Sequence, residues 1–484
     1  MEILKQRAIR GGFAKLIGQA TTFGLRLLYM IVVARLLTPT EFGLVAMVTA
    51  VTGVFDLFRD GGLSAAAIQQ VNVTEGQKSA LFWVNMAIGG ILTLLCLATA
   101  PILVYFYNEP RLFWVTIALS GGFIVSAAGV QHSAILQREL RYEAVTIIDT
   151  LSVLISTVIA IVMALEGFGY WSLVVSAIVF AAANTGMMWL IVPWKPGFPR
   201  GSAGVASMLR FGGTVTLNSL VVYVAYNLDK VLLGRVWGAD VLGFYSRACQ
   251  LINIPTSQLN TAIGGVAFSA LARLQDDPAR YKNYFLKGYS LVIAMTAPIT
   301  VFLAVFADDI VRVVLGAQWA EATMTFRLLT PTVLFFGIIN PLAWLMMSSG
   351  LQRRSLNVAL VLAPLCIASY LVGLPYGPTG VALAYSTTMV LWLVPHMIWC
   401  LRGTGISPAD LFQSIWPPLG SAVVSAAAAY AAQMALGHFE SAILRLALDS
   451  SVMAAVYCFM LLVVMGQRGF YVDLVSQLKT ARGR

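Results

Sequence analysis

Charged residues are scarce in this sequence of 484 residues: only 11% are charged, whereas 59% are hydrophobic. A soluble domain carries about a quarter charged residues, and its core cannot enclose this much apolar surface. The scarcity of charge excludes a soluble protein and indicates a chain that crosses a membrane many times. The formal net charge of +10 does not indicate a nucleic-acid partner, because the chain has no RNA- or DNA-binding motif and its cations lie mostly in short connections.

Signatures of catalysis and metal binding are also missing. The three histidines form no cluster, and the five cysteines lie in apolar segments without CxxC pairing. The chain has no HExxH motif, Walker A loop or GxSxG motif, and no connection is long enough to form a catalytic domain. We therefore predict no catalytic residue, no metal and no cofactor, and a secondary-type transporter rather than an enzyme.

Long apolar runs dominate the chain, and each has about the length that a helix needs to cross a bilayer, which is about 20 residues. They lie near residues 16–37, 42–66, 80–106, 112–132, 144–165, 169–193, 211–234, 241–267, 286–307, 325–349, 356–374, 378–401, 414–436 and 442–465. The sequence thus predicts an all-α polytopic membrane protein with about 14 transmembrane helices. The segment from Asp308 to Glu321 is a candidate surface helix.

Two short sequence matches indicate that the chain is duplicated. Arg35–Gly43 aligns without gaps on Arg235–Gly243, and Leu136–Arg138 recurs as Leu351–Arg353, in equivalent connections. Units with an even number of spans share one orientation, so we expect two parallel six-helix lobes around a central cavity. The predicted parts are an N-terminal lobe (1–193), a basic cytoplasmic connector (194–210), a C-terminal lobe (211–401), and two additional helices with a cytoplasmic tail (402–484).

The distribution of Lys and Arg predicts the orientation. If the N-terminus is cytoplasmic, the outer connections hold only Arg35, Arg111, Arg235, Arg312, Arg327 and Arg445. Most of the other cations then lie in inner connections and in the tails. Since cytoplasmic loops of membrane proteins are enriched in Lys and Arg, we predict that both termini are cytoplasmic.

A few cations lie within the predicted spans: Arg26, Arg59, Lys230 and Arg247. Arg26 is about ten residues from either end of the first span, too deep for its side chain to reach the headgroups easily. A guanidinium at this depth is costly on an isolated helix, so it needs a polar partner or a ligand. The four cations are therefore candidate substrate-binding residues.

Acidic residues near these cations leave two interpretations open. Asp56, Arg59 and Asp60 share one face of the second span, and Asp229 directly precedes Lys230. In a structural interpretation, the carboxylates pair with the arginines and the outer cations extend toward the headgroups. In a functional interpretation, the cations bind a phosphate, which suits the planar guanidinium. The three aspartates are then charge partners or sites for coupling Na⁺ or H⁺.

Several motifs resemble those of one transporter family. They are ARLLTPTEFGLVAM from Ala34, FRDGGLSAAAIQ from Phe58, LQRELRY from Leu136, LGAQW from Leu315 and YGPTGVALAYS from Tyr376. The chain resembles the polysaccharide-exporter branch of the multidrug/oligosaccharidyl-lipid/polysaccharide transporter superfamily. More specifically, it resembles the Wzx-type lipid-linked oligosaccharide flippases of the colanic acid and succinoglycan export kind. The resemblance covers nearly the whole chain.

This resemblance implies a flippase that moves undecaprenyl-pyrophosphate-linked oligosaccharide repeat units across the bacterial inner membrane, for exopolysaccharide, capsule or O-antigen synthesis. It implies alternating access around a cationic cavity, coupled to the membrane potential or to Na⁺ or H⁺. By position, Arg26, Arg59 and Arg247 match the cavity cations of related flippases, and we add Lys230. The implied partners are the lipid-linked oligosaccharide, membrane lipids, and the polysaccharide polymerase and glycosyltransferases of the same pathway.

The main alternative is an ion-coupled multidrug or organic-cation antiporter of the same superfamily. Its cavity should favour acidic and aromatic residues, whereas the charge balance on the first, second, seventh and eighth spans leans positive or neutral. A membrane polymerase or ligase would need a sizeable outer loop with catalytic residues, and the sequence has none. A purely structural scaffold would not explain Arg26.

Overall fold

The computed structural model describes residues 2–59, 74–198, 205–436, 441–469 and 471. This part of the chain is helical, with short connections and no strand. Ten of its helical segments are long and apolar enough to cross a membrane. The prediction of an all-α, multi-pass membrane protein is therefore confirmed.

The chain divides into two compact units, Met1–Gly243 and Phe244–Arg484. The helices of the first unit are α1 (Glu2–Leu36), α2 (Pro39–Arg59), α4 (Glu75–Tyr107), α5 (Leu112–Arg138), α6 (Tyr142–Leu165), α7 (Trp171–Ile191) and the first part of α8 (Val205–Ala272). The second unit holds the rest of α8 and α9 (Pro278–Val305), α10 (Ala307–Val314), η1 (Ala317–Trp319), α11 (Ala322–Leu329), α12 (Pro331–Ser348), α13 (Gln352–Gly373), η2 (Leu374–Tyr376), α14 (Gly377–Leu401), α15 (Pro408–Leu436), α16 (Ala442–Phe459) and η3 (Met460–Val464).

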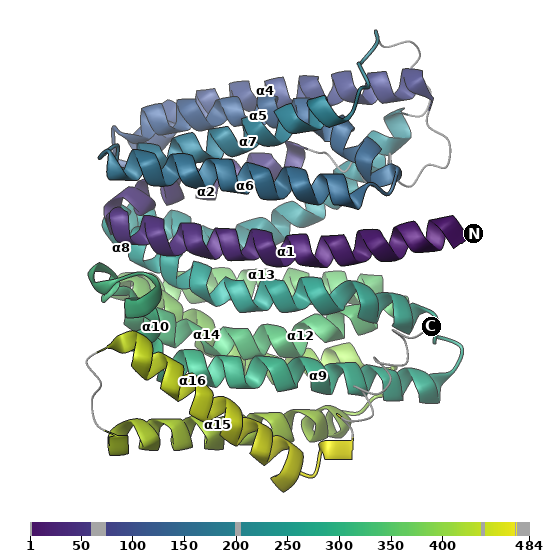
Figure 1. Ribbon diagram of the computed structural model, residues 1–484, viewed down its shortest axis with the longest axis vertical. Helices are drawn as coiled ribbons and strands as arrows, with labels where there is room; N and C mark the ends of the chain where they lie inside the picture. The colour runs from purple at the N-terminus through teal and green to yellow at the C-terminus, as the bar shows by residue number, and fades with distance from the viewer. Residues whose placement is uncertain (1, 60–73, 199–204, 437–440, 470, 472–484) are drawn as a thin grey trace. The chain divides into compact units, whose positions relative to one another are not determined.

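Each unit is a bundle of packed helices. In the first unit, α4 packs on α5, α1 on α6, and α7 on both α5 and α6, as Figure 1 shows. In the second unit, α9 packs on α12 and α15, and α16 packs on α15. The core of that bundle includes Tyr281, Phe285 and Tyr289, and the Tyr281 hydroxyl hydrogen-bonds the Ser348 hydroxyl at 2.7 Å. Close packing of side chains and hydrogen bonds between helices hold such a bundle together in a membrane.

Helix α8 is broken in its middle. Gly238 has φ 83° and ψ −176°, a conformation that glycine adopts without the steric penalty of a side chain. The break falls between the predicted spans 211–234 and 241–267. With α8 counted as two segments, the described helices are consistent with the predicted set of about 14 spans. Along the sequence, the boundary between the two compact units falls just after this break, between Gly243 and Phe244. The division into lobes at the connector 194–210 stays a prediction.

Local sequence explains where α4 begins and ends. Thr74 and Gln77 form a capping box, in which the Gln77 amide donates to the Thr74 hydroxyl and the Thr74 amide donates to the Gln77 side chain. Asn108 ends the helix in a left-handed conformation with φ 55°, which Asn tolerates better than most residues. The polar turns between spans thus set the boundaries of the apolar helices.

The two turns that match in sequence contact each other. The Thr40 hydroxyl donates to the Asp240 carboxylate at 3.0 Å, and these residues are 200 positions apart. The contact is reciprocal: a Cβ at Gly43 would lie 1.7 Å from the Ala239 carbonyl oxygen, and one at Gly243 would lie 1.9 Å from the Pro39 carbonyl oxygen. Reciprocal contact between equivalent residues is what a two-fold relation between duplicated segments predicts.

We expect Gly43→Val to destabilise the protein by about 1–3 kcal/mol, because the new side chain collides with backbone that cannot move aside. The measurement is thermal unfolding in detergent micelles, followed by intrinsic fluorescence. Gly24→Ala is the matched control, since a Cβ at Gly24 meets nothing within 4 Å. An unchanged unfolding temperature for Gly43→Val would contradict the close approach of the two turns.

Candidate functional site

The packing of α1 on α6 brings Arg26 close to a carboxylate. Gly18, Thr22 and Arg26 are four residues apart, so they share one face of α1. Gly18 lies so close to α6 that a Cβ there would be 1.7 Å from a Thr146 methyl carbon, and the Thr22 and Thr150 hydroxyls are 2.9 Å apart. Arg26 continues this face toward α6.

Asp149, on α6, interacts electrostatically with Arg26. Helical side chains lean toward the N-terminus of their helix, so Arg26 leans back toward Asp149. Asp149 also accepts a hydrogen bond of 2.9 Å from the Asn184 amide on α7. Asp149 and Asn184 are thus joined by a hydrogen bond across α6 and α7, and Arg26 on α1 acts on Asp149 through its charge.

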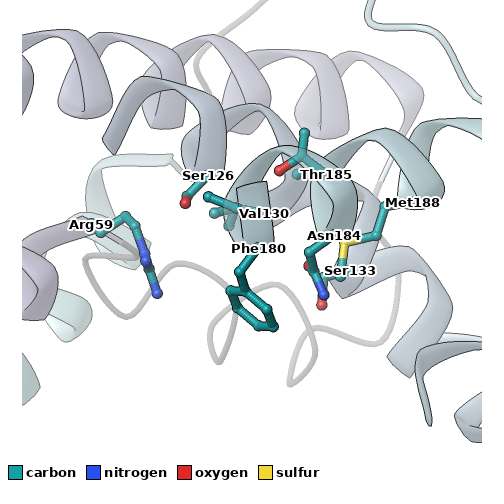
Figure 2. A pocket seen from close by; sticks show the side chains of 10 residues that line it. Arg59, Ser126, Val130, Ser133, Phe180, Asn184, Thr185 and Met188 are labelled. Atoms are coloured by element: carbon teal, nitrogen blue, oxygen red, sulfur yellow. The ribbon is translucent and has the colours of Figure 1, made fainter. Parts of the chain in front are cut away.

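Asn184 also lines a cavity of about 240 Å³. Its lining comes from α2, α5 and α7, and the residues are Arg59, Ser126, Gly129, Val130, Ser133, Phe180, Ala181, Asn184, Thr185 and Met188. In the view of Figure 2, the Phe180 ring projects between the Arg59 guanidinium and the Asn184 amide. The cavity thus combines one cation, several hydroxyl and amide groups, and one aromatic ring.

Helices α5 and α7 approach each other closely beside this cavity. A Cβ at Gly129 would lie 2.9 Å from the Thr185 hydroxyl oxygen, and that hydroxyl donates to the Val125 carbonyl at 3.0 Å. Small residues permit such close approach between membrane helices, and interhelical hydrogen bonds reinforce it. The polar wall of the cavity is therefore built on two closely packed helices.

Arg59 has an acidic neighbour but keeps donors for a ligand. Its guanidinium lies 3.1 Å from the Asp56 carboxylate, one turn earlier on α2, and the two side chains are 41% and 52% exposed. An exposed pair of this kind contributes only about 0.2–1 kcal/mol to stability. Since a guanidinium has about five N–H donors, Asp56 leaves others for a second acceptor. The predicted site residue Asp60 lies outside the described residues.

Lys230 and Asp229 lie at a different place in the first unit. The Lys230 ammonium donates to the Asn227 side chain at 2.7 Å, and the Lys230 amide donates to the Asp229 carboxylate at 2.8 Å. Asp229 is buried, and neither residue lines the cavity of Arg59. Tyr223, on the same helix, donates to α2 carbonyls, and its hydroxyl feels the charges of both Asp56 and Asp229.

Arg247 belongs to the second unit, where it hydrogen-bonds the Gln250 side chain one turn later on α8. Arg26, Arg59 and Lys230 belong to the first unit. A single cavity shared by all four cations stays a prediction. Among the residues that the structure describes, no group of three or more His, Cys, Asp or Glu side chains lies close enough to hold a metal ion.

Sequence reasoning missed Asp149. It is a lone acidic residue inside the predicted span 144–165, which is the same signal that singled out Arg26. The rule that ionisable residues within a span mark functional or paired positions would have found it. Its partner on α7 depends on how the helices pack, which hydropathy does not reveal.

Comparison with known proteins adds two kinds of similarity. The family described as "Polysaccharide biosynthesis protein" matches residues 32–324. The lipopolysaccharide biosynthesis protein WzxC of Escherichia coli (strain K12) is 26% identical over 436 residues, which cover 88% of each chain.

Solved structures share the fold. A structure named "Lipid II flippase MurJ, inward closed conformation" has a TM-score of 0.75 and 14% identity, and the match covers 95% of this chain and 99% of that chain. An inward-facing multidrug resistance transporter of the MATE family has a TM-score of 0.63 and 12% identity, with 81% of this chain and 96% of that chain covered. At these identities the similarity shows a common fold and nothing about the substrate.

Proposed function

Because this chain belongs to the family of polysaccharide biosynthesis proteins, we propose that it flips undecaprenyl-pyrophosphate-linked oligosaccharide repeat units across the cytoplasmic membrane. The product would serve exopolysaccharide, capsule or O-antigen synthesis. The observation that carries the proposal is the Arg59 guanidinium in a polar cavity between α2, α5 and α7. A guanidinium within an apolar span is energetically costly unless an anionic or polar group binds it.

The chemistry of the cavity suits a pyrophosphate headgroup. A guanidinium binds phosphate oxygens through two parallel hydrogen bonds, and Ser126, Ser133 and Asn184 add neutral donors around it. At about 240 Å³ the cavity is smaller than the roughly 300–1,000 Å³ of ordinary small-molecule pockets. We therefore infer that it holds the charged headgroup region and that the glycan and the polyprenyl chain lie outside it.

Arg26 acts behind this cavity in the proposed mechanism. The charge of Arg26 acts on Asp149, and Asp149 accepts a hydrogen bond from the Asn184 amide that lines the cavity. Arg26 would hold Asp149 in place and so keep the second amide hydrogen of Asn184 available to the ligand. This assigns Arg26 as a positioning residue and Arg59 as the residue that touches the phosphate. Arg247 and Lys230 are proposed to contact the substrate at other stages of the transport cycle.

Energy source, partners and location complete the proposal. Transport is driven by the membrane potential or by a Na⁺ or H⁺ gradient, with Asp56, Asp60 and Asp229 as candidate coupling groups. The polymerase and glycosyltransferases of the same pathway act on either side of this step. The asymmetry of Lys and Arg supports a bacterial inner-membrane location with both termini cytoplasmic.

An organic-cation antiporter with the same fold fits less well. The fold is compatible with it, since a MATE transporter is a structural neighbour. However, the described residues that line the cavity in the first unit include an arginine and no acidic side chain, with Asp56 beside that arginine. A guanidinium at the cavity wall favours a phosphate over a cationic drug.

The test is complementation of a bacterial strain that lacks its own exopolysaccharide flippase. We expect the wild-type chain to restore polymer and to move the lipid-linked repeat unit to the outer leaflet, as measured by a leaflet-specific glycan assay. An empty vector is the control. If the repeat unit stays in the inner leaflet while the cells gain resistance to organic cations, the antiporter is the correct assignment and the flippase proposal fails.

A further inference from the structure

Three charged residues come together in the second unit, far along the chain from every predicted site residue. Arg445 and Asp449 are four residues apart, so they share one face of α16. Helix α10 packs against α16 and contributes Asp309. The Asp309, Arg445 and Asp449 side chains form the group that we call the α16 triad.

Within the α16 triad, the guanidinium is already engaged. Arg445 Nη2 donates to Asp309 Oδ1, and Arg445 Nε donates to Asp309 Oδ2 at 3.3 Å. The two side chains are only 18% and 11% exposed. A forked pair of this kind is a strong and geometrically defined interaction in a region of low dielectric. Asp309 therefore accepts hydrogen bonds from Arg445, whereas Asp449 accepts none from it.

Asp449 is the unusual member of the triad. It is 0% exposed, and neither of its carboxylate oxygens accepts a hydrogen bond from any described residue. Burying an ionised carboxylate without donors costs several kcal/mol, so such a group takes up a proton instead. Asp410, on α15, shows the contrast: it accepts from the Ser407 amide and hydroxyl and pairs with Lys282 at 2.7 Å.

Few other titratable groups face Asp449. Its charged neighbours are Asp309 and Arg445. The remaining charged or titratable side chains on α10 and α15, which pack against α16, are Asp308 and Arg312 on α10, and Asp410 and Tyr430 on α15. Helix α9 also contacts α16, through the Ala294 carbonyl that accepts from the Tyr457 hydroxyl. Asp308 pairs with Arg327 at 2.5 Å, and His438 and Glu440 lie outside the described residues.

We propose that Asp449 is a proton-exchange site: when the contact between α10 and α16 opens to water, the carboxylic acid releases its proton to that water and Arg445 turns from Asp309 to the new carboxylate. With the proton bound, the triad carries two opposite charges and one neutral acid. After release, one guanidinium faces two carboxylates, and Arg445 is placed on the same helical face to reach Asp449. A proton fits this site better than a metal ion. Asp309 already accepts hydrogen bonds from Arg445, and the described residues contain no group of three or more potential metal ligands.

This site does not depend on which substrate the protein moves. Its chemistry is a protonation equilibrium linked to the contact between α10 and α16. If the flippase proposal failed in the complementation assay, Asp449 would still be expected to titrate. Conversely, a site that did not titrate would leave the cavity of Arg59 unaffected.

The test uses the full-length protein in lipid nanodiscs and the hydrophobic reagent dicyclohexylcarbodiimide, which modifies protonated carboxyl groups in apolar surroundings. Modification is located by peptide mass spectrometry. We expect Asp449 to be modified at about pH 5 and the modified fraction to fall at least about tenfold by about pH 9, since one pH unit changes a protonation ratio tenfold. Asp449→Asn should remove the adduct.

Two further variants separate a working site from a merely buried acid. Arg445→Gln removes the cation that would stabilise the ionised carboxylate of Asp449. Asp449 should then stay protonated, and so be modified, at high pH as well. Asp308→Asn is the matched control, since Asp308 is an exposed neighbour on α10, and its pH profile should equal that of the wild type. Absence of an Asp449 adduct at every pH, or an adduct independent of pH, would overturn the proposal. Protection by sodium at constant pH would overturn the assignment to a proton.

Discussion

Arg59→Ala is expected to reduce movement of the lipid-linked repeat unit to the outer leaflet by about ten- to a hundredfold at matched protein levels. A hydrogen bond to a charged group contributes about 1.5–3 kcal/mol, and each 1.4 kcal/mol is about a factor of ten. Arg59→Lys keeps the charge but loses the planar fork, so it should fall between the wild type and the alanine variant. The measurement is the leaflet-specific glycan assay.

Arg111→Ala is the matched control for this experiment. Arg111 is also an arginine in an ion pair, with Glu109 at 2.8 Å, but it lies in the turn between α4 and α5 and does not line the cavity. The hydrogen bonds from Arg111 hold the pKa of the Glu109 carboxyl below its usual value, so the pair is already complete without a ligand. Normal export by Arg59→Ala would show that Arg59 only pairs with Asp56, and the proposed headgroup site would be wrong.

Much of the fold could be predicted from hydropathy. In a bilayer every backbone polar group must be paired internally, so long apolar runs have few alternatives to spanning helices. The break at Gly238 falls between two predicted spans for the same reason. The match between Arg35–Gly43 and Arg235–Gly243 predicted a duplication, yet it could not predict that the two turns touch. That contact depends on side-chain and backbone fit between segments 200 residues apart.

The candidate site was only partly predictable. Position within the predicted spans identified Arg26 and Arg59, because a guanidinium within an apolar span needs a polar partner or a ligand. The sequence could not assign their neighbours: the charge of Arg26 acts on Asp149 of α6, whereas Arg59 lines a cavity with α5 and α7. Lys230 was predicted as a further cation within a span, and its ammonium donates to Asn227 on its own helix. Helix partners are set by packing among many apolar surfaces, and a hydropathy profile does not distinguish those surfaces.

The second large effect is expected from joining the two matched turns. Thr40→Cys combined with Asp240→Cys, in a chain whose five native cysteines are replaced by alanine, should form a disulfide on oxidation. The Thr40 hydroxyl and Asp240 carboxylate are 3.0 Å apart, so the new thiols are within reach of each other. We expect export to fall at least about tenfold on oxidation and to recover with a reductant, because the proposed alternating-access cycle requires the two matched turns to separate.

The control for this locking experiment is a disulfide that should not obstruct movement. Thr22→Cys with Thr150→Cys joins α1 to α6 away from the matched turns. The hydroxyls of Thr22 and Thr150 are 2.9 Å apart. If both disulfides abolish export, the loss reports general damage. If the Thr40–Asp240 link forms fully and export continues, the two turns stay together throughout the cycle. The reciprocal contact at Gly43 and Gly243 would then be a permanent hinge about which the duplicated segments turn, and the opening of the pathway would have to occur elsewhere.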